Sequence, residues 1–318
     1  MSYHLNSTRN YHLHRIETLG WELTVSNALN PAGSPCRRII KKNKSYGQLL
    51  YDYLDCLLPM LKIRHILEIG GGYGYLMKDI LTCHDPVKKA TMLDISPFLL
   101  EKQRETLAGF ANVIYRCEDF LETEPETLAG FDLAIMNENL GDFPTVTGID
   151  PQSIFNPHRD KMDIILKKMS HFIEKYDLAM PASSFMNINI GAMEAVEKLC
   201  AMSIPYIFLS EHSCEAAVPE KYKRLIRISQ LSQPERIQLK GHDEYTMKFS
   251  HLESIARAFG YRIIRGPLAD FVEFQWTNRL RVIMMAPSAA NDEDETIRQF
   301  IEDLYKYEYL LLMKENMG

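Results

Sequence analysis

The chain has 318 residues and a formal net charge of −6; 46% of its residues are hydrophobic and 25% are charged. This composition is ordinary for a globular protein in water, and the length suffices for one large domain or for a domain with a smaller appendage. The negative charge argues against a general nucleic-acid binder, because phosphate contacts need clustered Lys and Arg.

Other features of the sequence argue against further classes of protein. No apolar stretch reaches the roughly 18 residues that a membrane span needs, and residues 1–10 lack the apolar core of a signal peptide. The cysteines contain no C-x-x-C pair, so the sequence predicts neither a metal site nor a redox motif. Scattered cysteines are most simply reduced, which favours a cytoplasmic protein.

The first 44 residues are predicted to form an irregular N-terminal arm. Turn signals occur at Asn30-Pro31 and at Gly33-Ser34-Pro35. Such an arm could cover an active site or make a homodimer contact, and the sequence leaves both open. A helix with an apolar stripe follows, with Ser45 suited to its N-cap and Pro59 marking its end.

The centre of the chain is a strand, a glycine turn and a helix. Residues 63–69 form a short apolar run typical of a buried parallel strand, Gly70, Gly72 and Gly74 follow it, and residues 76–81 show helical spacing. This unit predicts a doubly wound α/β sheet, whose ligand lies beyond the carboxyl ends of the strands. Glycines at this point let the backbone approach that ligand closely.

The spacing of these glycines bears on the identity of the ligand. A dinucleotide site has the pattern G-x-G-x-x-G, whereas here the third glycine comes one position early and Tyr75 takes its place. Glu68 precedes the turn, and a carboxylate there suits a cationic ligand better than a pyrophosphate. The pattern E-x-G-x-G-x-G resembles motif I of class I S-adenosylmethionine (SAM) methyltransferases. A tight connection without any ligand is the alternative.

The second strand adds candidate residues for the same cofactor. It covers residues 90–93 and ends at Asp94, 94 − 74 = 20 positions after the last glycine. A carboxylate at this position can accept both ribose hydroxyls, although Asp94 could instead only cap the helix that Ser96 and Pro97 open. Ile95 is included in the predicted cofactor site.

The third strand, residues 112–116, leads to Asp119 and Phe120. We expect Asp119 to accept a hydrogen bond from the adenine amine and Phe120 to lie along the adenine ring. An equally good interpretation assigns Phe120 to the core.

The fourth strand, residues 131–136, runs directly into Asn137, Glu138 and Asp142. Such dense polarity after an apolar strand marks the place where an acceptor would be held, unless the segment is only a turn. We assign Asn137 to the cofactor site, and Glu138 and Asp142 to catalysis.

The remaining elements complete the sheet. Residues 145–204 predict a helical insertion, and residues 205–210 predict a fifth strand that ends near His212. His212 could act as a base or be a satisfied residue at a strand end. Residues 261–264 and 280–285 are expected to close the sheet as an antiparallel pair, and Asn291 to cap a C-terminal helix within residues 291–318.

Four islands of sequence carry a family resemblance. Residues 92–107 are similar to the segment "EISPxLRxxQxxxL", and Asn137-Glu138 with Phe143-Pro144 resembles the loop "NExxDxLP". Residues 46–50 resemble "FGELI", and residues 249–267 resemble "VDFxxLAxxA…GxxxxGP". These segments belong to the MidA group, SAM-dependent methyltransferases linked to mitochondrial complex I assembly, with bacterial relatives.

The resemblance implies a Rossmann-like seven-stranded methyltransferase fold over residues 45–290, SAM as cofactor and a protein arginine as acceptor. The chain also departs from the group. Residues 1–44 lack its "GYY" and "GDFxTAPE" segments, Gly141 stands where the group has Asp, and residues 208–212 replace its "LLxDYG". These departures leave open whether the methyl acceptor is a protein or a small molecule.

We therefore predict a SAM-dependent methyltransferase. Glu68 and the glycine turn would hold the methionine part of the cofactor, and Glu138 would bind a guanidinium through paired, charge-assisted hydrogen bonds, with Asp142 sharing that task. One alternative is a catalytically silent protein with the SAM fold that acts as a scaffold or assembly factor. A nicotinamide oxidoreductase is a third, which the glycine spacing disfavours.

Overall fold

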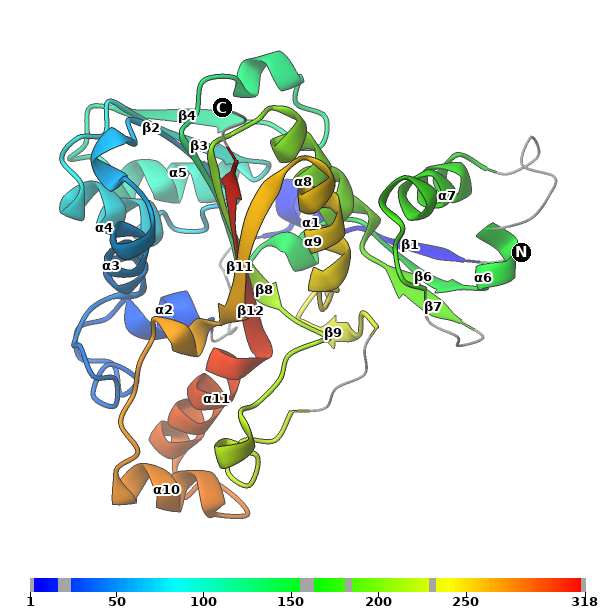
Figure 1. The fold of residues 1–318 in the computed structure, drawn as a ribbon. Helices are drawn as coiled ribbons and strands as arrows, with labels where there is room; N and C mark the ends of the chain where they lie inside the picture. The colour runs from blue at the N-terminus through cyan, green and yellow to red at the C-terminus, as the bar shows by residue number, and fades with distance from the viewer. Residues whose placement is uncertain (1–2, 17–23, 155–162, 181–184, 229–232, 316–318) are drawn as a thin grey trace.

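The computed structural model describes residues 3–16, 24–154, 163–180, 185–228 and 233–315 (Figure 1). Its strands are β1 (His4–Asn6), β2 (His65–Ile69), β3 (Lys89–Asp94), β4 (Val113–Cys117), β5 (Leu133–Asn137), β6 (Thr145–Ile149), β7 (Met186–Ile188), β8 (Tyr206–His212), β9 (Arg236–Gln238), β10 (Asp243–Tyr245), β11 (Tyr261–Pro267) and β12 (Tyr307–Lys314).

The helices alternate with these strands over much of the chain. The α-helices are α1 (Arg9–His14), α2 (Val25–Leu29), α3 (Tyr46–Leu57), α4 (Tyr75–Cys83), α5 (Pro97–Thr106), α6 (Pro151–Ile154), α7 (Ile164–Tyr176), α8 (Ile190–Ala201), α9 (Phe249–Ala258), α10 (Asn278–Met285) and α11 (Asp292–Lys306). Short 3-10 helices are η1 (Met60–Lys62), η2 (Pro125–Leu128), η3 (Leu140–Asp142), η5 (Glu220–Tyr222) and η6 (Leu268–Asp270).

Seven strands form the central sheet, in the order β4-β3-β2-β5-β8-β12-β11. The first five are parallel, and β12 is antiparallel to both β8 and β11. The predicted doubly wound, seven-stranded sheet is confirmed. Its strand order reverses between β2 and β5, and such a switch point is where open α/β sheets bind ligands.

The sheet separates two hydrophobic cores. Ile66 and Phe208 face the core formed with α3, α4 and α11, whereas Leu67 and Leu209 face the core formed with α7, α8 and α9. This division follows from the two-residue period of a strand, which sends successive side chains to opposite faces. Figure 1 shows α3 and α4 on one side of the sheet and α8 and α9 on the other.

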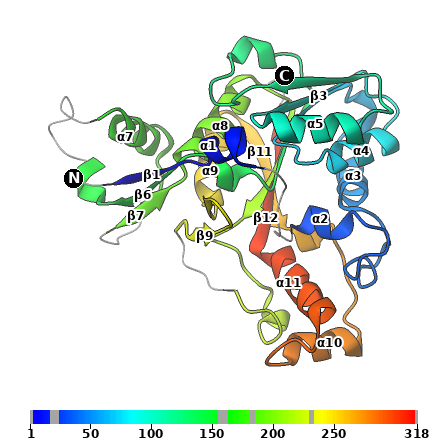
Figure 2. The ribbon, with the colours of Figure 1, turned by 180° about the vertical axis from the view of Figure 1, so that it is seen from behind.

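A second, smaller sheet has the order β1-β6-β7 and projects with α6 and α7 from the main body (Figures 1 and 2). Its antiparallel strand β1 pairs with β6, so that His4 lies opposite Thr147. The N-terminal segment is thereby attached to the insertion that follows β5. The predicted insertion over residues 145–204 contains β6 and β7, so its description as helical was wrong in that part.

Three helices begin where the sequence predicts them, each at a serine or asparagine cap. Ser45 and Gln48 form a capping box at the start of α3. The side chain of Ser96 accepts from Leu99 N at the start of α5, and that of Asn291 accepts from Asp294 N at the start of α11. Each cap satisfies a backbone N–H that the first helical turn leaves without a partner.

The prediction for the last 40 residues was partly wrong. Residues 280–285, expected as a strand, form most of α10, in which Leu280, Ile283 and Met284 are buried while Val282 and Met285 are 68% and 71% exposed. Burial at i, i+3 and i+4 is helical spacing. The strand that pairs with β11 is instead β12, whose continuous apolar run is buried on both faces. The C-terminal segment is thus a helix followed by a strand.

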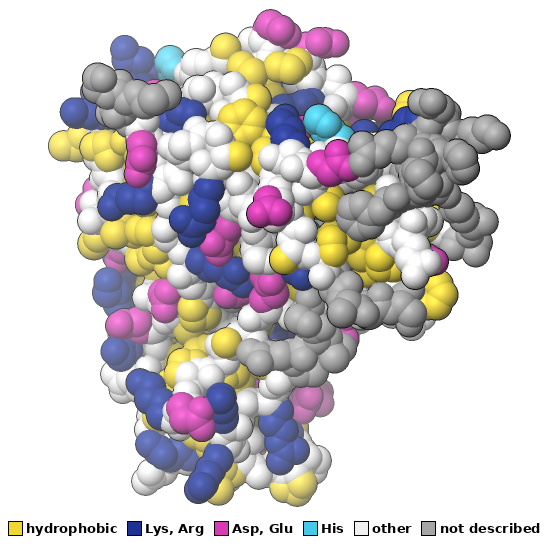
Figure 3. Space-filling view, turned by 45° about the vertical axis from the view of Figure 1, so that its right-hand side comes forward, with side chains coloured by type: hydrophobic (Ala, Val, Ile, Leu, Met, Phe, Trp, Pro, Cys, Tyr) yellow, Lys and Arg dark blue, Asp and Glu magenta, His cyan; other side chains and the backbone are white. Residues whose placement is uncertain are grey.

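The described surface carries charges of both signs. On the face drawn in Figure 3, Lys and Arg side chains are interspersed with Asp and Glu, without a large field of one sign. Among the described residues, no helix is long and apolar enough to cross a membrane.

Candidate functional site

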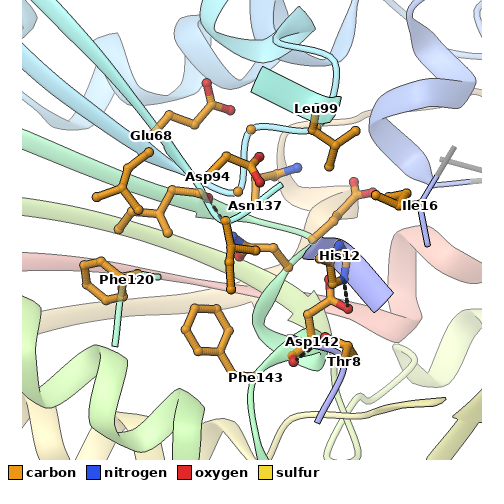
Figure 4. Close-up of a pocket in the computed structure, with 18 of the residues that line it drawn as sticks. Thr8, His12, Ile16, Glu68, Asp94, Leu99, Phe120, Asn137, Asp142 and Phe143 are labelled. Carbon is orange, nitrogen blue, oxygen red and sulfur yellow. Dashed lines mark hydrogen bonds and ion pairs between the residues drawn. The ribbon is translucent and has the colours of Figure 1, made fainter. Parts of the chain in front are cut away.

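A cavity of about 220 Å³ opens beyond the carboxyl ends of β2, β3 and β5 (Figure 4). It lies at the topological switch point of the sheet. The site residues predicted from the sequence that line it are Glu68, Gly70, Gly72, Asp94, Ile95, Asp119, Phe120, Asn137, Glu138 and Asp142. Gly74 is not among its lining residues and lies at the N-cap of α4, where a Cβ would meet Gln103 and Leu107.

The glycine turn requires glycine for two reasons. Gly70 and Gly72 have φ values of 65° and 53°, in the left-handed region that residues with a Cβ avoid. A Cβ on Gly70 would also lie 2.2 Å from Nδ2 of Asn139. That Nδ2 donates to the carbonyl oxygen of Ile69 over 2.6 Å and so joins the loop after β5 to the end of β2.

Glu68 presents a buried carboxyl group at this turn. Its Oε2 has no hydrogen-bond partner in the described structure. Burial, followed by the nearby charge of Asp94, raises the pKa of Glu68 to about 8. A buried carboxyl oxygen without a partner is costly unless a donor completes it, so this oxygen fits the cationic amino group of an amino-acid-like ligand.

Asp94 accepts two hydrogen bonds from residues of and next to α5, and it also lines the cavity. Its Oδ1 accepts from Ser96 N and its Oδ2 from Gln103 Nε2, each over 2.9 Å. Burial raises its pKa to about 6. A carboxylate has about four lone-pair sites, so these contacts leave acceptor capacity for hydroxyl groups. Because the N-cap of α5 is Ser96, the alternative in which Asp94 only caps this helix is wrong, and the contact of Asp94 with a ribose stays a prediction.

Asp119 already has partners in this structure. Its Oδ2 accepts from Arg9 Nε over 2.9 Å, and its Oδ1 accepts from Leu121 N over 3.0 Å. Phe120 is buried and contacts the edge of Phe143, with the ring centroids 6.5 Å apart (Figure 4). Phe120 thus belongs to the core and to the cavity wall, and an adenine amine would share Asp119 with Arg9.

Asn137 and Glu138 lie at the end of β5. Oδ1 of Asn137 accepts from Tyr46 Oη over 2.6 Å and from Ser210 Oγ over 2.8 Å, which fixes its side chain. Glu138 has a φ of 53°, an uncommon conformation for a residue with a Cβ.

The carboxyl group of Glu138 is only partly satisfied. Its Oε1 accepts from Ser26 N over 3.1 Å, whereas its buried Oε2 has no hydrogen-bond partner in the described residues. Burial raises its pKa to about 7. Glu138 therefore resembles Glu68 in being a buried carboxyl group that a donor could complete.

Asp142 anchors the N-terminal segment. Its Oδ1 lies 2.8 Å from Nε2 of His12, and its backbone oxygen accepts from Thr8 Oγ over 2.8 Å (Figure 4). Burial opposes ionisation of Asp142, but His12 holds its pKa below the usual value. The described part of the arm thus contributes to the cavity wall, and both alternatives for the arm, a cover over the site and a homodimer contact, stay predictions.

The sequence did not indicate which residues of this segment line the cavity. Thr8, Arg9, His12, Ile16 and Ser26 all line the cavity. They form no recognisable motif, and only the pairing of β1 with β6 and their contacts with the strand ends bring them there.

His212 was considered as a base, and the structure argues against this. Its ring packs against Tyr307, with centroids 3.7 Å apart, and it is not among the described residues that line the cavity. Burial lowers its pKa to about 3. His212 is instead a residue at the end of β8 whose ring packs against Tyr307, which favours the alternative interpretation.

Comparison with known proteins identifies the kind of domain that holds this cavity. Residues 67–159 match the family model described as a methyltransferase domain. The chain carries a methyltransferase domain. It is a SAM-dependent enzyme, and SAM is the cofactor that such a domain uses. No curated protein matches the chain in sequence.

The chain is also similar to solved structures at low sequence identity. An uncharacterized ACR superfamily protein from Burkholderia thailandensis is 14% identical, with 98% of this chain and 87% of that chain covered and a TM-score of 0.57. The N-methyltransferase NodS from Bradyrhizobium japonicum, solved with S-adenosyl-L-homocysteine, is 13% identical, with 85% of each chain covered and a TM-score of 0.40. The first similarity supports the fold of this chain alone.

Proposed function

We propose that this methyltransferase holds its donor at Glu68 and its acceptor at Glu138, and that the acceptor is a guanidinium, as the resemblance to the MidA group implies. One observation carries the proposal. Two buried carboxyl oxygens that lack partners among the described residues, Oε2 of Glu68 and Oε2 of Glu138, belong to the same cavity wall, at the ends of the neighbouring strands β2 and β5. Each is suited to a cationic group.

The cofactor end of the cavity would be formed by the strand ends. Glu68 would receive the amino group, Asp94 the ribose hydroxyls, and Asp119 with Phe120 the adenine. Bound SAM supplies an electrophilic methyl group on a sulfonium. The chain's own contribution is to position the two reactants and to keep water out, which can account for several kcal/mol of a transfer barrier.

The acceptor end would depend on Glu138. The backbone N–H of Ser26 donates to Oε1, so the carboxyl group has a fixed orientation. Its Oε2 would then accept from the bound acceptor. A guanidinium bound there gains charge-assisted hydrogen bonds, which are about twice as strong as neutral ones. Asp142, in contrast, is engaged by His12, so we assign it a positioning role rather than direct contact with the acceptor.

The first experiment measures cofactor binding. Calorimetric titration of the purified chain with SAM and with NADH should give saturable binding of SAM alone. Asp94→Ala removes the charged acceptor of the ribose hydroxyls and should weaken SAM binding by at least about 10-fold, since even one hydrogen bond to a charged group contributes about 1.5–3 kcal/mol. Absence of SAM binding would contradict the proposed site.

The second experiment separates an enzyme that methylates arginine from a silent assembly protein. Transfer of a labelled methyl group from SAM to arginine-containing peptides should occur with the natural chain and be strongly reduced in Glu138→Gln. SAM binding without transfer to any such peptide would contradict the guanidinium acceptor. If no small molecule accepted the methyl group either, the scaffold interpretation would be favoured.

A further inference from the structure

Three segments that are distant in sequence bring metal-ligating atoms together at one end of the cavity. His12 comes from α1, Asp142 from η3, and His242 from the turn between β9 and β10. Nε2 of His12 lies 2.8 Å from Oδ1 of Asp142, and Nε2 of His242 lies 3.7 Å from the same oxygen. All three ligand atoms lie within 4.8 Å of one another.

We infer that His12, Asp142 and His242 form a binding site for a divalent first-row transition metal, with Zn²⁺ as the cation to test first. Two imidazoles and one carboxylate are a common ligand set for such metals, with a fourth position left open. Bonds of about 2.1 Å to a tetrahedral ion place two ligand atoms about 3.4 Å apart, so small side-chain movements would bring these three atoms to one cation.

The neighbours of these side chains hold them in place. Tyr11 stacks on the His242 ring with centroids 4.1 Å apart, and Thr8 donates to the backbone oxygen of Asp142. The side chains of His12 and His242 are only 13% and 6% exposed, unlike a solvated cluster on a surface. Oε1 of Glu244 lies 3.1 Å from Nε2 of His242 and could supply a further ligand atom.

The position of the site suggests what the cation would do. In Figure 4, His12 and Asp142 point toward each other at the end of the cavity away from Glu68. A cation bound by both residues and by His242 would hold α1 against η3 and the β9–β10 turn. The segment that lines the cavity would then be fixed in place by the metal. This inference rests on ligand geometry and does not depend on the identity of the methyl acceptor.

The experiment titrates the full chain, after treatment with a chelator, with Zn²⁺ by calorimetry, and measures bound metal after dialysis. We expect one Zn²⁺ per chain, at least about 100-fold weaker binding in both His12→Ala and His242→Ala, and unchanged binding in His14→Ala. His14 is a matched control because it is an exposed histidine in the same short helix. Substitution by Co²⁺ should also give visible absorption that both variants lose.

Three controls make the result decisive. Circular dichroism shows whether each variant is folded, and His12→Gln, which preserves bulk, replaces His12→Ala if that variant is not. Absence of Zn²⁺ binding, or binding that either histidine variant leaves unchanged, would overturn the inference and indicate only an imidazole–carboxylate hydrogen-bond network. A parallel SAM titration of the same samples tests the proposed function separately, because SAM contacts Glu68 and Asp94 rather than these histidines.

Discussion

The two ends of the cavity are constructed in different ways. The end at Glu68 is made by the glycine turn and strand ends of one βαβ unit, so its residues lie within a short stretch of sequence. The end at Asp142 is made by α1, η3 and the β9–β10 turn, which only the folded chain brings together. Local backbone geometry thus specifies the cofactor end of the cavity, whereas contacts between distant segments specify the end at Asp142. Four predictions test it.

The largest effect is expected from Gly70→Ala. The added Cβ would require a strained φ and would displace Asn139, so we expect SAM binding to weaken more than about 100-fold and the free energy of unfolding to fall by about 2–4 kcal/mol. Calorimetry and chemical denaturation measure the two effects. Gly109→Ala is the control, because a Cβ there meets nothing within 4 Å. Equal effects in both variants would contradict the close approach at Gly70.

Glu138→Gln should act on the acceptor end alone. We expect kcat/KM for the arginine-containing peptide to fall about 30- to 150-fold, since truncating a charge-assisted contact costs about 2–3 kcal/mol, while the Kd for SAM changes less than about threefold. Steady-state kinetics with labelled SAM, together with calorimetry, separate these quantities. A variant that lost SAM binding instead would show that the two ends of the cavity are not independent.

The pH dependence of SAM binding should depend on Glu68. Because burial raises its pKa to about 8, the group is largely protonated at pH 7 in the free protein and must ionise to attract a cation. SAM affinity should therefore rise with pH by up to about tenfold per unit between pH 6 and 8 and level off above pH 8. Calorimetry across this pH range measures the affinity for SAM. Glu68→Gln is the control, because its affinity should not change with pH. A profile that Glu68→Gln leaves unchanged would assign the titration to another group.

The smallest effect is expected from Arg9→Ala, which removes the link between the N-terminal segment and Asp119. The Arg9 side chain in this ion pair is 46% exposed, and ion pairs with an exposed partner contribute little to stability. We expect the Kd for SAM to change less than about threefold and the melting temperature to stay nearly constant. A large loss of affinity would mean that the N-terminal segment helps to bind the adenine. The cofactor end would then also depend on contacts between distant segments.

The difference between the two ends of the cavity also explains which site residues could be predicted from the sequence. The glycine spacing, Glu68 and Asp94 were recognisable because each function follows from a residue type at a fixed distance from a strand end. His12 and His242 carry no such local signal, since each needs a partner that lies at least 100 residues away in the chain. Residues 280–285 were misassigned because a short apolar run fits a strand or a helix until its exposed positions are known.

The position of β12 has a consequence for the newly made chain. This strand lies between β8 and β11 and hydrogen-bonds to both. While a ribosome is still making residues 307–314, β8 presents an unpaired apolar edge, which is a template for aggregation. The pairing of β12 with β8 depends on contacts that are non-local in sequence and therefore slow to form. A chain shortened before residue 307 is thus expected to aggregate during synthesis, even though its entire cofactor site has already been translated.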